Sequence, residues 1–260
     1  MYPLRTHMGR TLTKNVADPL RGDSSPLRLC LVGARGRLGR IVAELAAEHD
    51  CKVVVEVTRD DVEPIRRSEA TFDVVVDVSS RNGIHRAVGI AVAHEVPLLE
   101  CVTDVDVRAK TALKVAESKI PVLHAPNTAF GVAILRMALR SIGRLTNSWP
   151  VTITETHHAE KVDQPSGTAR SLVEDLRISR DDIEDGHVIS NRVGEVVGEH
   201  EIAFLGEDEK IIIRHQATDR RVFGHGVLRA ARWLSKERSP GRYSIDDTLE
   251  GLDEPPAITD

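Results

Sequence analysis

The sequence predicts an α/β protein with a doubly wound parallel sheet, followed by a run of antiparallel strands. Two observations support this fold class. Short apolar segments alternate with helical patterns between residues 27 and 123, which is the pattern that parallel sheets require. Strand-like segments without intervening helices then follow between residues 187 and 217. The 260 residues are enough for one large domain or two modest ones with proper cores.

The first half of the chain supplies the parallel sheet. Buried strands are expected where β-branched and aliphatic residues run together. These segments are Leu27–Val32, Lys52–Thr58, Phe72–Val78, Pro97–Cys101 and Pro121–Leu123. Amphipathic helices are expected between them, at Arg40–His49, Gly83–His94 and Asp106–Ser118.

The second half begins with a long helix, Val132–Leu145, that we expect to link two domains. The strand Val151–His157 and the helix Ala169–Leu176 come next, and the helix Phe223–Lys236 ends the ordered part. Three antiparallel strands are predicted between these helices, at His187–Arg192, Val196–Phe204 and Lys210–Ala217. Residues 1–26, the acidic loop Asp181–Gly186 and the residues after Glu237 are polar, and we expect a flexible extension, a solvated loop and a partly disordered tail.

Composition narrows the classes of function. The formal net charge of −5 does not favour a nucleic-acid or membrane surface as partner, and no apolar run is long enough to span a bilayer. Cys30, Cys51 and Cys101 show no metal-ligand spacing and lie in apolar segments. An odd, sparse set of cysteines suggests structural thiols in a reducing cytoplasm, and we expect no metal site.

A glycine-rich turn follows the first strand. Gly33, Gly36 and Gly39 are spaced Gly-x-x-Gly-x-x-Gly and precede a helix, which is the order that a dinucleotide-binding loop needs. Gly33 permits a tight turn, Gly36 admits a pyrophosphate, and Gly39 brings the helix close to the sheet. A glycine turn alone also occurs in many unrelated proteins, but its place at the first strand strengthens the dinucleotide interpretation.

The end of the second strand indicates the cofactor. Sites that prefer NAD usually carry an acid there for the ribose hydroxyls. Here the strand ends at Thr58-Arg59, and Arg59 is suited to the 2′-phosphate of NADPH. We therefore predict NADPH, with NADH tolerated, although a solvated loop cation explains Arg59 equally well.

Ionisable groups gather at the end of the strand Val151–His157. Glu155, His157, His158 and Lys161 come together before a turn into a helix whose cap is Ser166 or Thr168. Helix-start amides and a lysine suit an anion, and histidine carries protons near neutral pH. Adjacent histidines on a strand face opposite ways, so one of them is expected only to pack. The residues predict an acid–base step on a small anionic substrate, with His157 or His158 as proton carrier.

This stretch closely resembles the signature of the 4-hydroxy-tetrahydrodipicolinate (dihydrodipicolinate) reductase family. The signature Glu-x-His-His-x-x-Lys-x-Asp-x-Pro-Ser-Gly-Thr-Ala runs without a gap from Glu155 to Ala169. The glycine loop with Arg37, the step Asp77-Val78-Ser79 and the segments Val193–His200 and His215–Gly226 also resemble the family. The resemblance covers roughly residues 27–249.

The resemblance implies a domain organisation. A Rossmann-type dinucleotide-binding domain would comprise residues 27–127 and 220–250. An inserted α+β domain with an open mixed sheet, residues 128–219, would bind the substrate and build a homotetramer. Residues 1–26 and 251–260 would lie outside both domains as a flexible extension and a flexible tail.

The resemblance also implies an activity: reduction of the cyclic imine from 4-hydroxy-tetrahydrodipicolinate by NAD(P)H, in cytoplasmic diaminopimelate and lysine biosynthesis. His157 would donate the proton with Lys161 as its partner. His158, Lys161, Ser166, Gly167 and Thr168 would hold the carboxylates of this small cyclic dicarboxylate. The implied cofactor-binding residues are Gly33, Ala34, Arg35, Gly36, Arg37, Leu38, Arg59, Cys101, Thr103, Ala125, Asn127 and Thr128.

One loop departs from the family pattern. Where the family usually has Gly-Thr-Thr-Gly against the nicotinamide, this chain has Cys101-Val102-Thr103-Asp104. The departure leaves two alternatives beside the reductase: a paralogue that reduces a related cyclic imine, and a non-catalytic homologue. The intact set of His157, His158 and Lys161 argues against the non-catalytic alternative.

Overall fold

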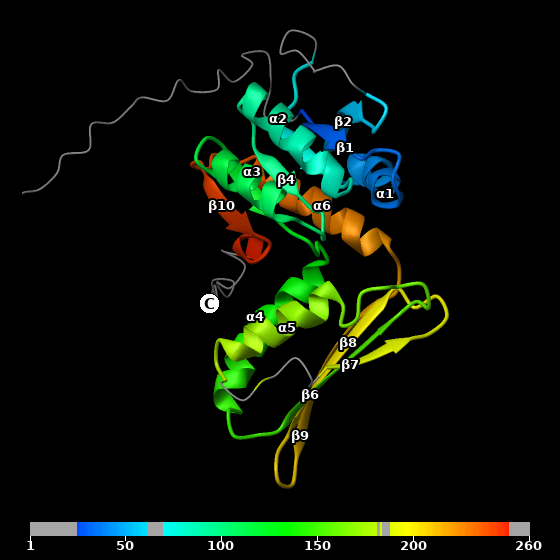
Figure 1. Cartoon of the computed structure of the whole chain (residues 1–260), viewed down its shortest axis with the longest axis vertical. Coiled ribbons are helices and arrows are strands. Elements are labelled where there is room, and N and C mark those ends of the chain that lie inside the picture. The colour runs from blue at the N-terminus through cyan, green and yellow to red at the C-terminus, as the bar shows by residue number, and fades with distance from the viewer. Residues whose placement is uncertain (1–24, 62–69, 181–182, 184–187, 250–260) are drawn as a thin grey trace, which may run out of the picture.

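The computed structural model describes residues 25–61, 70–180, 183 and 188–249, which form two sheets with their helices (Figure 1). The first sheet has six parallel strands in the order β10-β5-β4-β3-β1-β2. The strands are β1 (Leu27–Val32), β2 (Cys51–Val57), β3 (Val74–Asp77), β4 (Leu98–Glu100), β5 (Pro121–His124) and β10 (Gly241–Ser244). Because β1 lies inside the sheet between β2 and β3, the strand order reverses beside it, as a doubly wound sheet requires.

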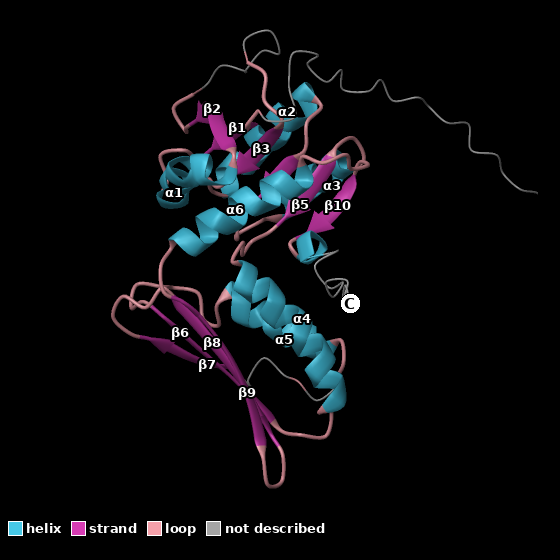
Figure 2. Ribbon diagram, turned by 180° about the vertical axis from the view of Figure 1, so that it is seen from behind, coloured by secondary structure: helices cyan, strands magenta, loops and turns pink. Residues whose placement is uncertain are grey.

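Helices cover both faces of the parallel sheet (Figures 1 and 2). They are α1 (Arg37–Leu45), α2 (Ile84–His94), α3 (Val107–Glu117) and α6 (Arg221–Leu234), with the short 3₁₀ helices η1 (Ala46–His49), η2 (Arg81–Gly83) and η4 (Asp246–Leu249). Buried residues of α1 and α6 pack on the face that carries Leu29, Leu31 and Val76. Those of α2 and α3 pack on the opposite face, with Val75 and Leu98. The doubly wound prediction is therefore confirmed.

The second sheet is mixed and has the order β7-β6-β8-β9. Its strands are β6 (Val151–His157), β7 (Val188–Arg192), β8 (Gly198–Leu205) and β9 (Lys210–Ala217). β8 runs antiparallel to β6 and β9, as predicted, but β7 pairs parallel to β6. The expectation that all three later strands alternate as antiparallel strands is thus wrong for β7. A helix lies between β6 and β7 in the chain, and a strand–helix–strand unit returns its second strand parallel to the first.

Two helices, α4 (Phe130–Leu145) and α5 (Gly167–Arg177), pack against one face of the mixed sheet (Figure 2). Leu139 of α4 and Leu172 of α5 share a core with Ile153 and Phe204 of the strands. Ser166 caps α5, because its hydroxyl accepts from the amide of Ala169 at 3.1 Å, so the structure selects Ser166 over Thr168 as the cap. The cap fixes the start of α5 at the end of β6.

The segment after Glu237 differs from the prediction of a polar tail. Residues 241–244 form β10, which pairs parallel with β5, and η4 follows. The ring of Tyr243 lies edge-on to Trp233, and the Arg238 guanidinium stacks over Trp233 at 4.0 Å. These aromatic contacts hold a short polar strand at the sheet edge, which alternation alone does not reveal. The predicted extension (residues 1–24), most of the acidic loop (181–182 and 184–187) and the final residues (250–260) lie outside the described part of the chain.

Among the described residues, no helix is long and apolar enough to cross a bilayer.

Candidate active site

The glycine loop joins β1 to α1 and lines a pocket of about 250 Å³. Gly33 has a φ of +88°, a conformation that favours glycine. A side chain at Gly33 would come within 2.6 Å of the Ser79 backbone, and one at Gly39 within 2.2 Å of the Gly33 carbonyl oxygen. The pocket walls are Gly33, Arg35, Gly36, Thr58, Arg59, Asp60, Val78, Ser79 and Ser80. This tight strand–turn–helix fits the diphosphate of a dinucleotide.

Charged side chains at the end of β2 surround this pocket. Arg59 is exposed and lines it, as do Arg35 and Asp60, whose side chains pair at 3.5 Å. Asp61 instead caps the turn, because its carboxylate accepts from the Thr58 amide at 2.5 Å and from its hydroxyl at 2.8 Å. The rim of the pocket at the end of β2 thus carries Arg35 and Arg59, with Asp60 beside Arg35.

The two loops that follow β4 and β5 carry the remaining predicted cofactor residues. Cys101 and Val102 are buried and Thr103 is exposed, while Asp104 accepts a hydrogen bond from Arg81 of η2. Burial raises the pKa of the Cys101 thiol, so the thiol stays protonated. Ala125 is buried in the core beneath the next loop.

Asn127 connects the parallel-sheet part of the chain to the start of α5. Its amide Nδ2 donates to the Thr168 hydroxyl at 2.8 Å, and its Oδ1 accepts from the Ala129 amide at 2.9 Å. Thr128 donates to the carbonyl oxygen of Phe223 at 2.8 Å. The predicted cofactor residue Asn127 and the predicted substrate residue Thr168 are therefore direct partners.

Glu155 is the hub of the acid–base cluster. It is fully buried on β6 and accepts from His157 Nδ1 with one oxygen. Its other oxygen accepts from Arg192 at 2.9 Å and from the Ser166 amide at 3.3 Å. Burial would raise the pKa of Glu155, but the hydrogen bond from Arg192 and the nearby His157 shift it below its ordinary value. The carboxylate therefore stays charged and fixes β6, β7 and the start of α5 together.

His157 is held in one orientation. Because a carboxylate only accepts, Nδ1 carries a proton and Nε2 is left to act on a ligand. Gly198 leaves space beside it, since a side chain there would come within 3.0 Å of Nε2. Burial lowers the pKa of His157, and the Glu155 carboxylate opposes that shift. A buried histidine beside a fixed carboxylate is suited to exchange a proton with a bound substrate.

Lys161 and the α5 start form a cationic cradle. Lys161 Nζ donates to Asp163 at 2.6 Å, and the Gly167 amide donates to the same carboxylate at 3.2 Å. Arg192 binds the carbonyl oxygens of Lys161 and Asp163 at 3.1 and 2.6 Å, which holds this loop in place. The cradle thus binds the carboxylate of Asp163, which shows that its donors suit a carboxylate group. His158 is half-buried and directly follows the last residue of β6.

Arg192 and His200 belong to this site although neither was proposed from the sequence. His157 and Arg192 are register partners between β6 and β7, and Glu155 and His200 are partners between β6 and β8. Burial, and next His157, lower the pKa of His200 to about 3, so it remains neutral. Strand alternation, which the sequence shows, indicates which residues of one strand share a face. The sequence does not show the register between strands far apart in the chain, and that register brings Arg192 and His200 to Glu155.

Glu155, His157 and His200 also place ligand-type atoms within 4.8 Å of one another, a geometry that could hold a metal ion. The Arg192 guanidinium on Glu155 opposes a metal cation there, because it already neutralises the carboxylate. The cluster is best explained by its hydrogen bonds.

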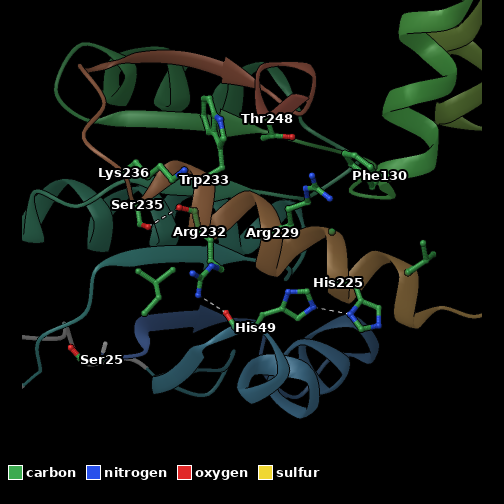
Figure 3. Close-up of a pocket in the computed structure, with 13 residues that line it drawn as sticks. Ser25, His49, Phe130, His225, Arg229, Arg232, Trp233, Ser235, Lys236 and Thr248 are labelled. Carbon is green, nitrogen blue, oxygen red and sulfur yellow. Dashed lines mark hydrogen bonds between the residues drawn. The ribbon is translucent and has the colours of Figure 1, made fainter. Parts of the chain in front are cut away.

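A larger hollow, of about 730 Å³, lies away from this chemistry between α6 and η1 (Figure 3). Two arginines that line it already have interaction partners: Arg229 stacks over Phe130 at 3.8 Å, and Arg232 donates to the His49 carbonyl oxygen at 2.8 Å. Size alone therefore does not identify the site.

The fold and the two sets of residues define a class of protein: a two-sheet, nicotinamide-dependent oxidoreductase with an acid–base centre. Family models confirm and refine this class. "Dihydrodipicolinate reductase, N-terminus" matches residues 27–128, and "Dihydrodipicolinate reductase, C-terminus" matches residues 131–249. The chain belongs to the dihydrodipicolinate reductase family, whose members are NAD(P)H-dependent oxidoreductases.

Individual relatives carry names from the same family. The chain is 35% identical over 242 residues to the 4-hydroxy-tetrahydrodipicolinate reductase of Stenotrophomonas maltophilia (strain R551-3), covering 88% of this chain and 100% of that protein. It is 31% identical to the enzyme of the same name from Archaeoglobus fulgidus, covering 86% and 100%. A solved dipicolinate-bound dihydrodipicolinate reductase from Paenisporosarcina sp. TG-14 shares the fold, with a TM-score of 0.66, 18% identity and coverage of 85% and 99%.

Proposed function

We propose that this protein reduces the cyclic imine derived from 4-hydroxy-tetrahydrodipicolinate to tetrahydrodipicolinate, with NADPH as preferred cofactor and NADH tolerated. The observation that carries the proposal is the buried Glu155–His157 pair beside the Lys161 and Gly167 cradle. Such a cradle suits a dicarboxylate, and the histidine supplies the proton that reduction of an imine requires. The relatives named above support the same reaction.

In this proposal, different residues orient the proton donor, transfer the proton and bind the substrate. A bound nicotinamide supplies the hydride; the protein supplies position, charge and the proton. Glu155 holds the proton on Nδ1 of His157 and stabilises the imidazolium form. The imidazolium delivers its Nε2 proton to the substrate nitrogen and is left as the neutral Nδ1–H tautomer, with Lys161 as partner. His158, Lys161 and the Ser166–Thr168 helix start hold the substrate carboxylates. Asn127 ties the two parts of the site together through Thr168.

The cofactor preference rests on Arg35 and Arg59 beside the small pocket. Removing Arg59 by substitution with Ala should weaken NADPH binding by about tenfold, equivalent to roughly 1.4 kcal/mol, and leave NADH nearly unchanged. Fluorescence titration with both nucleotides measures this. Equal weakening for both nucleotides would show that Arg59 does not recognise the 2′-phosphate.

We also propose two domains, residues 27–127 with 220–250 and residues 128–219, and a homotetramer in the cytoplasm. The face of the mixed sheet opposite α4 and α5 exposes Ile189, Leu205 and Ile212, with 56%, 37% and 48% of their surface accessible. Exposed aliphatic residues on an open sheet favour association with other copies. Light scattering coupled to gel filtration tests the assembly, and a monomer would contradict it.

The direct test of the reaction is oxidation of NADPH by purified protein with freshly generated 4-hydroxy-tetrahydrodipicolinate. A panel of other cyclic imines, measured in parallel, tests the alternative that the protein is a paralogue with a different imine substrate, which the Cys101–Asp104 loop suggests. The proposal expects the dipicolinate precursor to give the highest kcat/KM. A different preferred imine, or no oxidation with any of them, would overturn it.

A further inference from the structure

Two buried carboxyl groups lie side by side where β3 and β4 end. Asp77 and Glu100 are register partners in these parallel strands, and both are 0% exposed. Register partners point to the same face of a sheet, here the one that α2 and α3 cover. Asp77 Oδ2 and Glu100 Oε2 have no hydrogen-bond donor among the described residues. Two ionised carboxylates would repel each other in this dry environment, whereas one proton between them satisfies both oxygens.

The outer oxygens of the pair hold two loops. Asp77 Oδ1 accepts from the Ser79 amide at 2.9 Å, and Glu100 Oε1 accepts from the Val102 amide at 2.8 Å. Ser79 packs directly against Gly33 and forms a wall of the small pocket. Val102 belongs to the loop that departs from the family pattern. The pair therefore connects the dinucleotide pocket to that loop, and Arg81 with Asp104 forms a second link on the surface.

Within the described part of the chain, no cation is among the causes that shift the pKa of Glu100. The titratable and charged groups on the surrounding elements include Cys30 on β1, Arg81 on η2, Cys101 and Asp104 after β4, and His124 on β5. On the two helices they are His85, Arg86 and His94 of α2, and Arg108, Lys110, Lys114 and Glu117 of α3 with its cap Asp106. None of these groups is a principal cause of the shift in the pKa of Glu100. Burial, followed by the negative charge of Asp77, raises the pKa of Glu100 to about 9, and burial also raises that of Asp77.

We propose that Asp77 and Glu100 share one proton and act as positioning residues for the two loops of the cofactor site. With the proton in place, the Ser79 and Val102 amides are held at a fixed separation. Without it, the two carboxylates repel and the loops move apart. The inference rests on the cofactor site of the proposed function, but it does not depend on the identity of the substrate.

Fluorescence titration with NADPH between pH 7 and 10, without substrate, tests the inference. Wild-type affinity should fall by about tenfold as pH rises past the pKa of the pair, which corresponds to a one-unit pKa difference between free and bound protein. Glu100→Gln carries a permanent amide hydrogen in place of the shared proton, so its affinity should stay flat. Glu237→Gln removes an exposed glutamate after α6 and should follow the wild type.

The ligand-free protein gives a second measurement. A carboxyl group with a raised folded-state pKa makes stability fall as pH rises from the unfolded value towards the folded one. The melting temperature of Glu100→Gln relative to wild type should therefore increase between about pH 5 and 9. Asp77→Asn places the amide on the other member and should behave alike if Glu100→Gln folds poorly.

Three results would overturn the inference. Wild-type affinity could be independent of pH, or both amide variants could follow the wild-type profile. Alternatively, added Mg²⁺ or Ca²⁺ could restore affinity at pH 10, which would show that the pair binds a cation rather than a proton. Each of these leaves the reductase proposal standing, whereas pH-dependent binding without turnover would overturn only the reductase.

Discussion

Each of the two sheets carries a fully buried glutamate near a strand end, and the two behave in opposite ways. Glu155 of the mixed sheet faces Arg192 and His157, and its pKa lies below the ordinary value. Glu100 of the parallel sheet faces Asp77, and its pKa is raised to about 9. Both side chains are 0% exposed, and burial raises the pKa of both; at Glu155 the hydrogen bonds and the positive neighbours outweigh burial, whereas at Glu100 the charge of Asp77 adds to it. One glutamate can orient a cation or a proton donor; the other stores a proton.

Breaking the Glu155 hub should have the largest effect. Glu155→Gln leaves the Arg192 guanidinium without its buried partner, and we expect a loss of about 3 kcal/mol in the free energy of unfolding. Turnover should fall by about 10²-fold, because His157 loses the group that fixes its tautomer. Losing the carboxylate also lowers the pKa of His157 further, so the alkaline limb of the kcat/KM profile should move to lower pH.

The control for this variant is Glu199→Gln. Glu199 pairs with Arg214 at 2.6 Å, but that pair is at the surface, since the Arg214 side chain is 53% exposed. Its loss should cost at most about 1 kcal/mol and leave the pH profile unchanged. Chemical denaturation and initial-rate kinetics measure both variants. If the two variants lost equal stability, burial of the Glu155 pair would have no special importance.

The two buried glutamates should also shape opposite limbs of the pH–stability curve. Glu155 has a lowered pKa, so its contribution is present above about pH 4.5 and is lost as pH falls through the folded value. Glu100 has a raised pKa, so its contribution is lost as pH rises towards about 9. Thermal unfolding from pH 3 to 10 should show Glu155→Gln flattening the acid limb and Glu100→Gln the alkaline limb. If both variants flattened the same limb of the pH–stability curve, the contrast between Glu155 and Glu100 would be contradicted.

A third carboxylate, at the surface of the same site, should give the smallest effect. Asp163 occupies the cradle of Lys161 and Gly167, so a substrate carboxylate that binds there, as we propose, would have to displace it. Asp163→Asn should therefore tighten the binding of pyridine-2,6-dicarboxylate by about three- to fivefold, within the ~1 kcal/mol of a partly exposed ion pair. The exposed neighbour Glu160 gives the control, Glu160→Gln. Weaker binding by Asp163→Asn would mean that Asp163 instead holds Lys161 in place for the ligand.

The sequence predicted those parts of the molecule that depend on neighbouring residues. A short apolar run located β1, and strand alternation located β6, both at their observed bounds. The local run from Glu155 to Thr168 brought His157, Lys161 and the helix cap together. The family resemblance, confirmed by the comparisons, supplied the two-sheet arrangement and the reaction.

The sequence did not predict contacts that depend on register between distant strands. Arg192 and His200 reach Glu155 only because β7 and β8 flank β6 in a particular register. The pairing of Asp77 with Glu100 likewise follows from the alignment of β3 with β4. The edge strand β10 escaped prediction because it has only four residues and no apolar run; its pairing with β5 and the packing of Tyr243 on the core place it in the sheet.

The most direct test of the central claim compares wild type with His157→Gln in two measurements: NADPH oxidation with freshly generated 4-hydroxy-tetrahydrodipicolinate, and NADPH affinity by fluorescence. If His157 is the proton donor, turnover should fall by about 10²- to 10⁴-fold, while NADPH affinity should stay within about twofold. Unchanged turnover, or a loss of turnover that follows a loss of cofactor affinity, would contradict the role of the Glu155–His157 pair as the acid–base centre.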